Sequence, residues 1–139
     1  MKFRGVYACL SNMYPSPLKI NGLYFSCAES AFQSFKTADP EIRKQFQFIS
    51  GPEAKRLGRK LELRSDWNDI RLDVMKAVLE IKFKRYPEFM AALEKAKRSY
   101  GELVEDNTWG DTFWGRCNGK GENHLGKLLQ EVLEGEVPF

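Results

Sequence analysis

The order of the secondary-structure signals constrains the fold of this chain most strongly. Asn21-Gly22 separates two short apolar segments, residues 17–20 and 23–25, which predicts a β-hairpin with a two-residue turn. Residues 1–25 as a whole are expected to form short strands, whereas helical periodicity prevails from residue 28 onward. Strands followed by helices, without regular alternation, favour a mostly helical α+β fold over a doubly wound sheet.

Several helices are expected after the hairpin. Ser26 and Glu29 have the spacing of a capping box at the start of the first helix. Asp39-Pro40 predicts the start of a second helix, and residues 50–58 predict a third. The clearest helix follows Asp66, where apolar residues recur at three- and four-residue steps. These residues are Ile70, Val74, Ala77, Val78 and Ile81.

The second half of the chain continues this pattern. Tyr86-Pro87 ends the long helix and precedes another one. Residues 103–105 are expected to form a short strand, and residues 106–121 form a loop rich in glycine and tryptophan. A final helix follows, with Asn123 predicted as its N-cap. All of these elements are expected to form a single domain, residues 1–139.

Composition excludes several classes of protein. Lys and Arg (22) exceed Asp and Glu (19), and a net charge of +3 is too small to indicate non-specific nucleic-acid binding. The apolar stretches are too short to span a membrane, and the N-terminus does not resemble a signal peptide. The single histidine, His124, argues against a multi-histidine zinc site. Three scattered cysteines without metal-ligand spacing predict free thiols in a reducing cytoplasm.

Glu29, Gln33 and Lys36 form the first candidate functional group. If one helix carries all three, Glu29 and Lys36 share a face and lie about 10.5 Å apart along the axis, which suits two groups that flank one ligand. The structural interpretation is that Glu29 closes the capping box and Lys36 is a solvated lysine in the last turn. The spacing alone favours the structural interpretation.

Residues 105–115 form the second candidate group. Three carboxylates and two tryptophans occur within these eleven residues, together with glycines that allow sharp turns. Tryptophans beside carboxylates suit a sugar or base that is held by stacking, with polar groups at its edge. The alternative is a packed tryptophan corner with turn-forming aspartate and glycine. The pattern leaves both interpretations open.

Two further patterns are weaker. A basic helix edge could bind phosphate, although such a run of charges is usually a solvated face. It comprises Lys55, Arg56, Arg59, Lys60 and Arg64, continued by Arg71. Gly115, Gly119 and Gly121 precede the final helix and resemble a phosphate-binding cradle only loosely, because they lack the P-loop spacing.

Five short segments, in order along nearly the whole chain, resemble motifs of the NADAR (YbiA-like) family of N-glycosidases. They are residues 10–17; Glu29 with Phe32, Gln33 and Lys36; Trp67 with Arg71, Met75, Lys82 and Phe83; Glu105 with Asp111, Trp114 and Gly115; and residues 121–126. Met13 stands where the family usually has phenylalanine, Ser30 where histidine is common, and the last helix lacks the family's arginine. The resemblance implies the same YbiA-like α+β fold.

The resemblance also implies cleavage of the N-glycosidic bond between a ribose and a nitrogenous base. The family's known activities are hydrolysis of phosphorylated early riboflavin intermediates and removal of ADP-ribose from guanine bases. The expected substrate is therefore a phosphorylated ribosyl or ADP-ribosyl compound, either free or carried on DNA or RNA. Cleavage develops positive charge that carboxylates stabilise, and a lysine with a lowered pKa can attack the anomeric carbon. Neither route requires a metal or redox cofactor.

The resemblance and the helix spacing together lead to a hypothesis for the site. Lys36 is the nucleophile, Glu29 is the general acid/base, and Asp111 orients the ribose hydroxyls or stabilises the cationic centre. Trp67 and Trp114 stack on the base and the sugar. Further substrate contacts are assigned to Asn12, Gln33, Glu105, Gly115 and Asn123.

Two other classes of function are consistent with the same residues. The pocket could bind ADP-ribose or a nucleotide without catalysis, although the presence of both Glu29 and Lys36 favours an enzyme. Alternatively, the basic residues from Lys55 to Arg64 could bind nucleic acid, with an affinity that falls steeply with salt. The small net charge makes this the weakest complete account.

Overall fold

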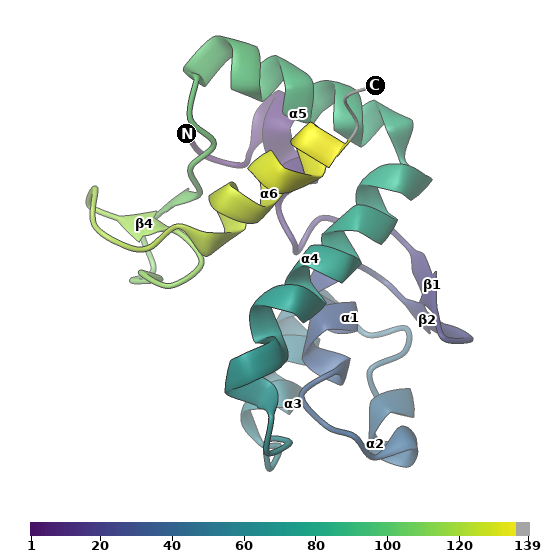
Figure 1. Ribbon diagram of the computed structural model, residues 1–139. Coiled ribbons are helices and arrows are strands. Elements are labelled where there is room, and N and C mark those ends of the chain that lie inside the picture. Colours follow the sequence, from purple (N-terminus) through teal and green to yellow (C-terminus); the bar gives the residue numbers. More distant parts are fainter. Residues whose placement is uncertain (136–139) are drawn as a thin grey trace. The chain divides into compact units, whose positions relative to one another are not determined.

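The computed structural model describes residues 1–135. It has the mostly helical α+β fold with an N-terminal hairpin that the sequence predicts (Figure 1). Its contacts divide the chain into two compact units. One unit comprises residues 12–85, and the other comprises residues 1–11 with the chain from residue 86 onward. Each unit is described by itself.

Strands β1 (Leu18–Ile20) and β2 (Leu23–Phe25) form the predicted antiparallel hairpin. Ile20 pairs with Leu23, so Asn21 and Gly22 alone make the turn. Their φ angles are +52° and +80°, which a type I′ turn requires and which asparagine and glycine adopt at little cost. The sequence prediction is confirmed here.

Helix α1 (Ala28–Ser34) is the central helix of the unit formed by residues 12–85. All of its residues are buried, because α3 (Gly51–Arg59), α4 (Trp67–Arg85) and the hairpin all pack against it. Helix α2 (Pro40–Lys44) also contacts it. The predicted starts of α2, α3 and α4 are confirmed. A polar side chain on α1 therefore lies inside the unit, where hydrogen bonds hold it in place.

The start of α1 differs from the prediction. Its N-cap is Cys27, and the hydroxyl of Ser30 completes the capping box by accepting a hydrogen bond from Cys27 N at 3.3 Å. The hydroxyl of Ser26 instead donates to the carbonyl of Ile49, on the segment that leads into α3. The predicted capping box of Ser26 and Glu29 is wrong, because a tertiary contact engages Ser26. The Glu29 carboxylate is thus not the capping group.

The buried face of α4 also differs from the prediction. Ala77 and Ile81 of the predicted stripe are exposed, whereas Val78 is buried. The other buried residues of α4 are Trp67, Met75, Leu79, Lys82 and Phe83. The helix carries two apolar stripes at helical spacing, and periodicity cannot choose between them. Packing against α1 and β1 selects the buried one.

The other unit is built on α5 (Pro87–Tyr100). It contacts the 3₁₀ helix η1 (Gly5–Leu10) on one side and α6 (His124–Gly135) on another (Figure 1). The strand expected in the first residues of the chain is absent at positions 5–10, where η1 lies instead. Cys9 and Leu10 are the buried residues of η1, and the burial of their side chains stabilises its position.

A short parallel pair, β3 (Asp106–Asn107) with β4 (Arg116–Cys117), lies between α5 and α6 in the sequence. The strand predicted at residues 103–105 is wrong, because β3 begins only at Asp106. The side chain of Asn123 bonds to this segment in place of a neighbouring strand. Its Nδ2 donates to Leu103 O at 2.9 Å, and its Oδ1 accepts from Glu105 N at 3.1 Å.

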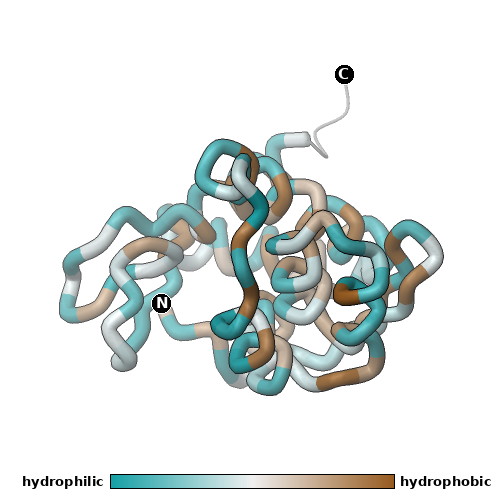
Figure 2. The backbone as a smooth tube through the Cα atoms, turned by 90° about the horizontal axis from the view of Figure 1, so that it is seen from below, coloured by the Kyte–Doolittle hydropathy of each residue, from teal (hydrophilic) through white to brown (hydrophobic). Residues whose placement is uncertain are grey.

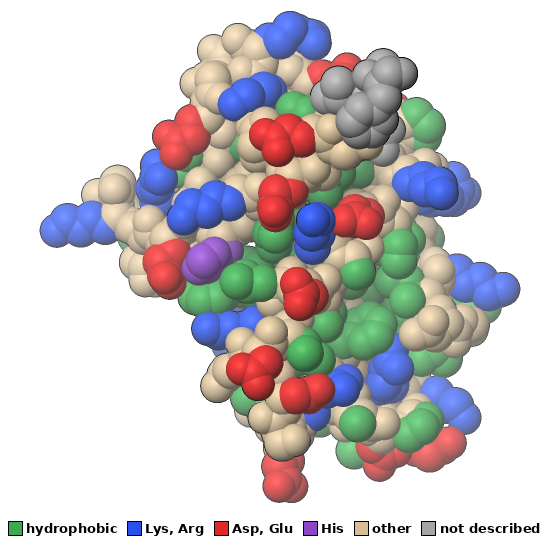
Figure 3. All heavy atoms as spheres, in the orientation of Figure 1, with side chains coloured by type: hydrophobic (Ala, Val, Ile, Leu, Met, Phe, Trp, Pro, Cys, Tyr) green, Lys and Arg blue, Asp and Glu red, His purple; other side chains and the backbone are tan. Residues whose placement is uncertain are grey.

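The surface agrees with the mild charge balance. Figure 2 shows hydrophilic and hydrophobic residues alternating at short intervals along the chain. On the face seen in Figure 3, basic and acidic side chains are interspersed. Among residues 1–135, no helix combines the length and the apolar character needed to cross a membrane. Cys9, Cys27 and Cys117 are free thiols, as predicted.

Candidate active site

Glu29 lies in the first turn of α1 and is 9% exposed. Its backbone N–H donates to the carbonyl of Asn12 at 2.9 Å, so a residue outside the helix satisfies one of the unpaired donors of the first turn. Its Oε1 accepts a hydrogen bond from Gln33 Nε2, one turn further along, at 2.9 Å. The carboxylate is thus buried and held in a defined position by a neutral amide.

Gln33 is itself fixed by the close approach of α3. A Cβ atom at Gly58 would lie 2.0 Å from Gln33 Oε1, so only glycine allows this contact. Gln33 is 4% exposed, and its Oε1 accepts no hydrogen bond from any residue between 1 and 135. The amide is therefore confined between Glu29 and the backbone of α3. This geometry gives Gln33 a role in positioning Glu29, and its substrate contact stays a prediction.

Lys36 lies just beyond α1 and not on it. The helix ends at Ser34 with Phe35 as its C-cap, and Lys36 N donates to Gln33 O at 3.1 Å in a tighter turn. The expectation that Glu29 and Lys36 share one helix face is therefore wrong, because the last turn of the predicted helix does not form.

Burial lowers the pKa of the Lys36 ammonium group below its ordinary value. Glu29 acts in the opposite direction, and the positive charges of Arg59 and Lys55 lower the pKa further. Glu29 and Lys36 are thus close enough to interact electrostatically. A lysine whose pKa is lowered has a larger fraction of neutral amine at a given pH, which is the nucleophilic form.

Several cations surround Lys36. Arg64 N donates to Lys36 O at 2.9 Å, and the Arg64 guanidinium binds both carboxylate oxygens of Asp66, at 2.6 and 3.2 Å. That hydrogen bond lowers the pKa of the Asp66 carboxyl group. Arg43, on α2, lies over the Phe35 ring, 4.1 Å from its centroid. Of the predicted basic edge, Lys55, Arg59 and Arg64 therefore belong to the surroundings of the candidate lysine.

Asn12 lies next to the start of α1. Besides the contact of its carbonyl with Glu29, its Nδ2 approaches Met75 Sδ at 3.5 Å. Its Oδ1 is buried and accepts no hydrogen bond within residues 1–135. A buried acceptor without a donor is costly, so this oxygen is suited to a substrate hydroxyl. The predicted contact between Asn12 and the substrate is consistent with this geometry and stays a prediction.

Trp67 is a core side chain of its unit. It is 5% exposed, and its ring packs on that of Phe32 with 5.1 Å between centroids. This contact joins the start of α4 to α1 and so supports the helix that carries Glu29. Stacking of Trp67 on a base or sugar stays a prediction.

In the other unit, the Asp111 carboxylate closes its own loop. Asp111 Oδ1 accepts hydrogen bonds from Phe113 N at 3.1 Å and Trp114 N at 2.9 Å. The side chain of Asn107 holds the backbone of Asp111 from both sides, at 2.9 and 3.1 Å. One carboxylate oxygen of Asp111 thus has the turn-forming role considered for this loop. The catalytic role of Asp111 stays a prediction.

Glu105, Gly115 and Trp114 lie along the same loop. A Cβ at Gly115 would lie 2.4 Å from Glu105 O, so glycine is required where the two segments of the loop meet. Trp114 is half-buried and meets the ring of Phe113 edge to face, with centroids 4.9 Å apart. Because its ring is only partly covered, Trp114 is better placed than Trp67 to contact a ligand.

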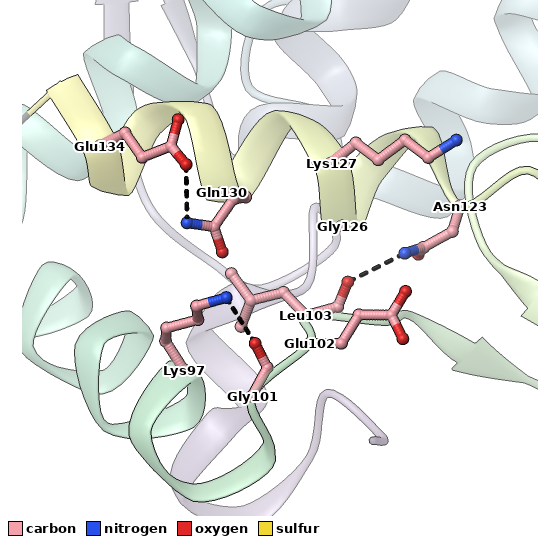
Figure 4. A pocket seen from close by; sticks show the side chains of 9 residues that line it. All are labelled: Lys97, Gly101, Glu102, Leu103, Asn123, Gly126, Lys127, Gln130 and Glu134. Atoms are coloured by element: carbon pink, nitrogen blue, oxygen red, sulfur yellow. Dashed lines mark hydrogen bonds between the residues drawn. The ribbon is translucent and has the colours of Figure 1, made fainter.

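Asn123 precedes α6, but its side chain does not cap that helix. Its φ is +55°, and its side-chain amide donates to Leu103 O (Figure 4) and accepts from Glu105 N. The first N–H groups of α6, those of His124 and Leu125, donate to carbonyls of the loop at 3.1 and 2.9 Å. The suggested phosphate cradle at this helix is therefore wrong, because backbone carbonyls occupy its donors.

A groove of about 430 Å³ lies beside α6 (Figure 4). Of the predicted site residues only Asn123 lines it, and the Asn123 amide already bonds to the backbone. The predicted catalytic residues Glu29, Lys36 and Asp111 do not line it. This groove is therefore not the candidate active site.

The structure thus gathers the predicted site residues into two groups. Asn12, Glu29, Gln33 and Lys36 lie around the two ends of α1, and Trp67 belongs to the core of the same unit. The second group is held by β3, β4 and the start of α6, and it comprises Glu105, Asp111, Trp114, Gly115 and Asn123.

Sequence reasoning missed two residues near these groups. Arg43 was outside the predicted basic edge, although its place in the last turn of α2 is visible in the sequence. Asn107 was not singled out within residues 105–115, although asparagine is a common turn residue. Lys82, named above only as part of a family motif, is completely buried, which the sequence analysis did not predict.

The model of the NADAR domain family matches residues 2–135 and so covers both units. The chain belongs to the NADAR family. One NADAR relative, N-glycosidase YbiA of Shigella boydii serotype 4 (strain Sb227), is 36% identical over 132 residues. That match covers 92% of this chain and 81% of the relative.

Two further comparisons extend the NADAR assignment. The chloroplastic riboflavin biosynthesis protein PYRR of Zea mays is 30% identical over 155 residues, covering 96% of this chain but 24% of the maize protein. The NMR structure of the E. coli protein YbiA matches with a TM-score of 0.83 at 32% identity. It covers 97% of this chain and 83% of that structure, which confirms the NADAR fold that the resemblance implied.

Proposed function

We propose that this protein is an N-glycosidase that hydrolyses the bond between a ribose and a nitrogenous base. The observation that carries the proposal is the pairing of a buried, amide-held carboxylate, Glu29, with a nearby lysine, Lys36, whose pKa is lowered by burial. Such a pair supplies an acid/base and a nucleophile. The names of the relatives, N-glycosidase YbiA and a riboflavin biosynthesis protein, support the same activity.

In the proposed reaction the neutral amine of Lys36 attacks the anomeric carbon, and the bond from that carbon to the base nitrogen breaks. The Glu29 carboxyl group gives its proton to the departing nitrogen, so the base leaves as a neutral molecule. One proton of the attached lysine nitrogen then moves to the ring oxygen. The ring opens, and the sugar is held on Lys36 as a protonated Schiff base.

Hydrolysis of the Schiff base returns a proton to Glu29. Its carboxylate takes a proton from water while the hydroxide adds to the imine carbon. Collapse of the resulting carbinolamine releases the sugar and restores the amine of Lys36. The net reaction adds one water across the N-glycosidic bond, and it consumes neither an oxidant nor a reductant.

The other predicted residues have supporting roles. The second carboxylate oxygen of Asp111 would orient the ribose hydroxyls or stabilise positive charge at the anomeric carbon. Trp114 and Trp67 would contact the base and sugar, with Trp114 as the more accessible ring. The buried Oδ1 of Asn12 would accept from a substrate hydroxyl. Gln33, Glu105, Gly115 and Asn123 would shape the site through the contacts described above.

The substrate is proposed to be a phosphorylated ribosyl or ADP-ribosyl compound, such as a riboflavin-pathway ribosylaminopyrimidine phosphate or ADP-ribosylated guanine, free or carried on DNA or RNA. The riboflavin name of the maize relative supports the first of these. A reducing, cytoplasmic location is proposed on the basis of three free thiols. Both units are proposed to act as one domain, since one family model covers them.

One incubation tests the activity. Purified protein is mixed with an ADP-ribosyl-guanine oligonucleotide and, separately, with a ribosylaminopyrimidine phosphate, and the released base is measured by chromatography. We expect release from at least one substrate, and loss of release in Glu29→Gln. Binding without release in the unmodified protein would instead identify a non-catalytic ADP-ribose or nucleotide reader.

Borohydride reduction during turnover tests the covalent step separately. We expect a stable sugar adduct on Lys36, located by mass spectrometry of the digested protein. Full turnover without any substrate-dependent adduct would contradict the Schiff-base route and leave direct attack by water, with Glu29 as the base.

A further inference from the structure

We infer that Arg43 and Arg64, which flank the Phe35-Lys36 segment after α1, bind a phosphate group of the substrate. The inference rests on the proposed function, because it places a substrate phosphate next to the proposed nucleophile. Arg43 lies outside the predicted basic edge. At the suggested glycine cradle, the first two N–H groups of α6 are already bonded to carbonyls.

Two arginines converge on the same short segment. The Arg43 guanidinium lies over the ring of Phe35, 4.1 Å from its centroid, and this contact orients its plane. Arg64 is tied to Lys36 by the backbone hydrogen bond of 2.9 Å. Asp66 holds the Arg64 guanidinium through two bonds. Both arginines are therefore oriented before any ligand binds, which lowers the cost of binding.

Two nitrogen atoms of the Arg43 guanidinium group are buried without a hydrogen-bond acceptor. Its Nε and Nη2 are both inaccessible to solvent, and neither donates to any residue between 1 and 135. No carboxylate of those residues forms an ion pair with it. Buried cationic donors without a partner are unfavourable, so a shift of the Arg43 side chain that brings them to phosphate oxygens, which match the guanidinium fork, would be favourable.

The charges around this segment are mutually repulsive. Burial and the neighbouring Arg64 lower the pKa of the Arg43 guanidinium, and Arg59 and Lys55 act in the same direction on Lys36. Within residues 1–135, Arg64 pairs directly with a carboxylate, whereas Arg43, Lys55 and Arg59 do not. A bound dianion would relieve this repulsion, and it would also stabilise the protonated Schiff base on Lys36.

Paired substrates test the inference. Release of base is measured for a phosphorylated ribosyl substrate and for its dephosphorylated counterpart, with the unmodified protein, Arg43→Gln and the exposed control Arg98→Gln. We expect Arg43→Gln to raise KM for the phosphorylated substrate about tenfold to a hundredfold, with a small change in kcat. The dephosphorylated substrate should lose less than threefold, and Arg98→Gln should behave as the unmodified protein. Equal losses on both substrates, or no loss, would overturn the inference.

Calorimetric titration separates this inference from the proposed function. Ribose 5-phosphate, ADP-ribose and ribose are titrated into each variant, so the readout needs no turnover. Binding of ribose 5-phosphate that depends on Arg43 indicates a monoester site, and dependence with ADP-ribose alone indicates a diphosphate site. Arg43-dependent binding in a protein that releases no base would keep the site and reject the glycosidase. Arg43→Lys, which retains the charge, should recover part of the affinity, and its failure to do so in a folded protein would contradict phosphate recognition.

Discussion

The segment around α1 and the loop of residues 105–115 contain the same kinds of residue, but the carboxylate has a different role in each. Each combines a carboxylate, a side-chain amide and a glycine whose Cβ would collide with its neighbour. Around α1, a serine hydroxyl and a backbone carbonyl satisfy the helix start, and Gln33 holds the Glu29 carboxylate. In the loop, the Asp111 carboxylate itself bonds to two backbone N–H groups.

In both regions, the groups that bond to the nearby backbone determine what the carboxylate can do. Where other groups cap the backbone, the carboxylate is held by a neutral amide and can exchange protons. Where the carboxylate is the cap, part of its hydrogen-bonding capacity is committed to the fold. Glu29 is therefore the stronger candidate for acid/base chemistry, and Asp111 contributes through its second oxygen.

Removal of the Lys36 amine gives the largest expected effect on the first region. Lys36→Met should lower kcat/KM about 1000-fold, because the nucleophile is lost while the apolar stem remains. The exposed Lys84→Met on α4 is the matched control and should retain activity. Steady-state kinetics of base release measure both. A loss smaller than tenfold in Lys36→Met would reject the nucleophile assignment.

Loss of the Asn123 amide should destabilise the second region. Asn123→Ala leaves Leu103 O and Glu105 N without their partners, and it should lower the free energy of unfolding by about 2–4 kcal/mol. Urea titration measures the change. Asn68→Ala, on the exposed side of α4, should stay within about 0.5 kcal/mol. Equal stabilities of the two variants would disprove the bonding role of the Asn123 amide.

A larger side chain at Gly58 should lower both stability and activity in the first region, although Gly58 is not itself a proposed catalytic residue. Gly58→Ala places a methyl group against Gln33 Oε1, so the amide must shift and its hydrogen bond to Glu29 is disturbed. We expect a loss of about 1–3 kcal/mol in stability and about tenfold in kcat. Gly135→Ala, which meets nothing within 4 Å, is the control for the change of residue type. Unchanged kcat in Gly58→Ala would argue against a positioning role for Gln33.

Two substitutions at Asp111 distinguish its structural role in the loop from its proposed contact with the ribose. Asp111→Asn keeps an acceptor oxygen for the Phe113 and Trp114 N–H groups, and Asp111→Ala removes it. Only Asp111→Ala should lose about 1–2 kcal/mol of stability, measured by urea unfolding. Both should lose about tenfold in kcat/KM if the second oxygen contacts ribose. Full activity in Asp111→Asn would restrict the residue to its structural role.

The pH dependence gives the smallest expected effect. Activity should rise with pH as Lys36 loses its proton, at a pH below that of an ordinary lysine because its pKa is lowered. Arg59→Gln removes a charge that lowers this pKa, so the rise should move to higher pH. Arg56→Gln on the same helix should leave it in place. A pH–rate profile compares them, and a shift to lower pH in Arg59→Gln would contradict the assignment.

The same pKa has a consequence for stability. Because the pKa of Lys36 is lower in the folded state than in the unfolded chain, the unfolded chain binds more protons between the two values. The burial of Lys36 is therefore most unfavourable below the lowered pKa. The free energy of unfolding should rise with pH through that interval, and Lys36→Met should remove this rise.

Much of the local structure was predictable from short-range chemistry. Features that depend only on neighbours in the chain are confirmed. They are the Asn21-Gly22 hairpin, the helix starts at Asp39 and Ser50, and the break at Pro87. The family resemblance likewise depends on residues at fixed spacings, and the match to the NADAR family confirms it.

Two of the errors involve partners that are distant in sequence. Ser26 bonds to Ile49 and so leaves the cap of α1 to Cys27. The side-chain amide of Asn123 bonds to Leu103 O. It therefore does not cap α6, and it takes the place of a neighbouring strand beside residues 103–105. Spacing along the chain cannot reveal which of several competing hydrogen bonds forms when distant segments meet.

The order of the elements, the membership of the family and the residue types available for chemistry follow from the amino-acid sequence, because they depend on composition, spacing and local conformational preference. Tertiary structure alone decided which carboxylate serves the fold and which is held by a neutral amide beside Lys36. It also decided which arginine, Arg43, is left with buried donors that need an acceptor. Burial and hydrogen-bond partners set those outcomes, and both arise only when α1, α2 and α3 are packed together.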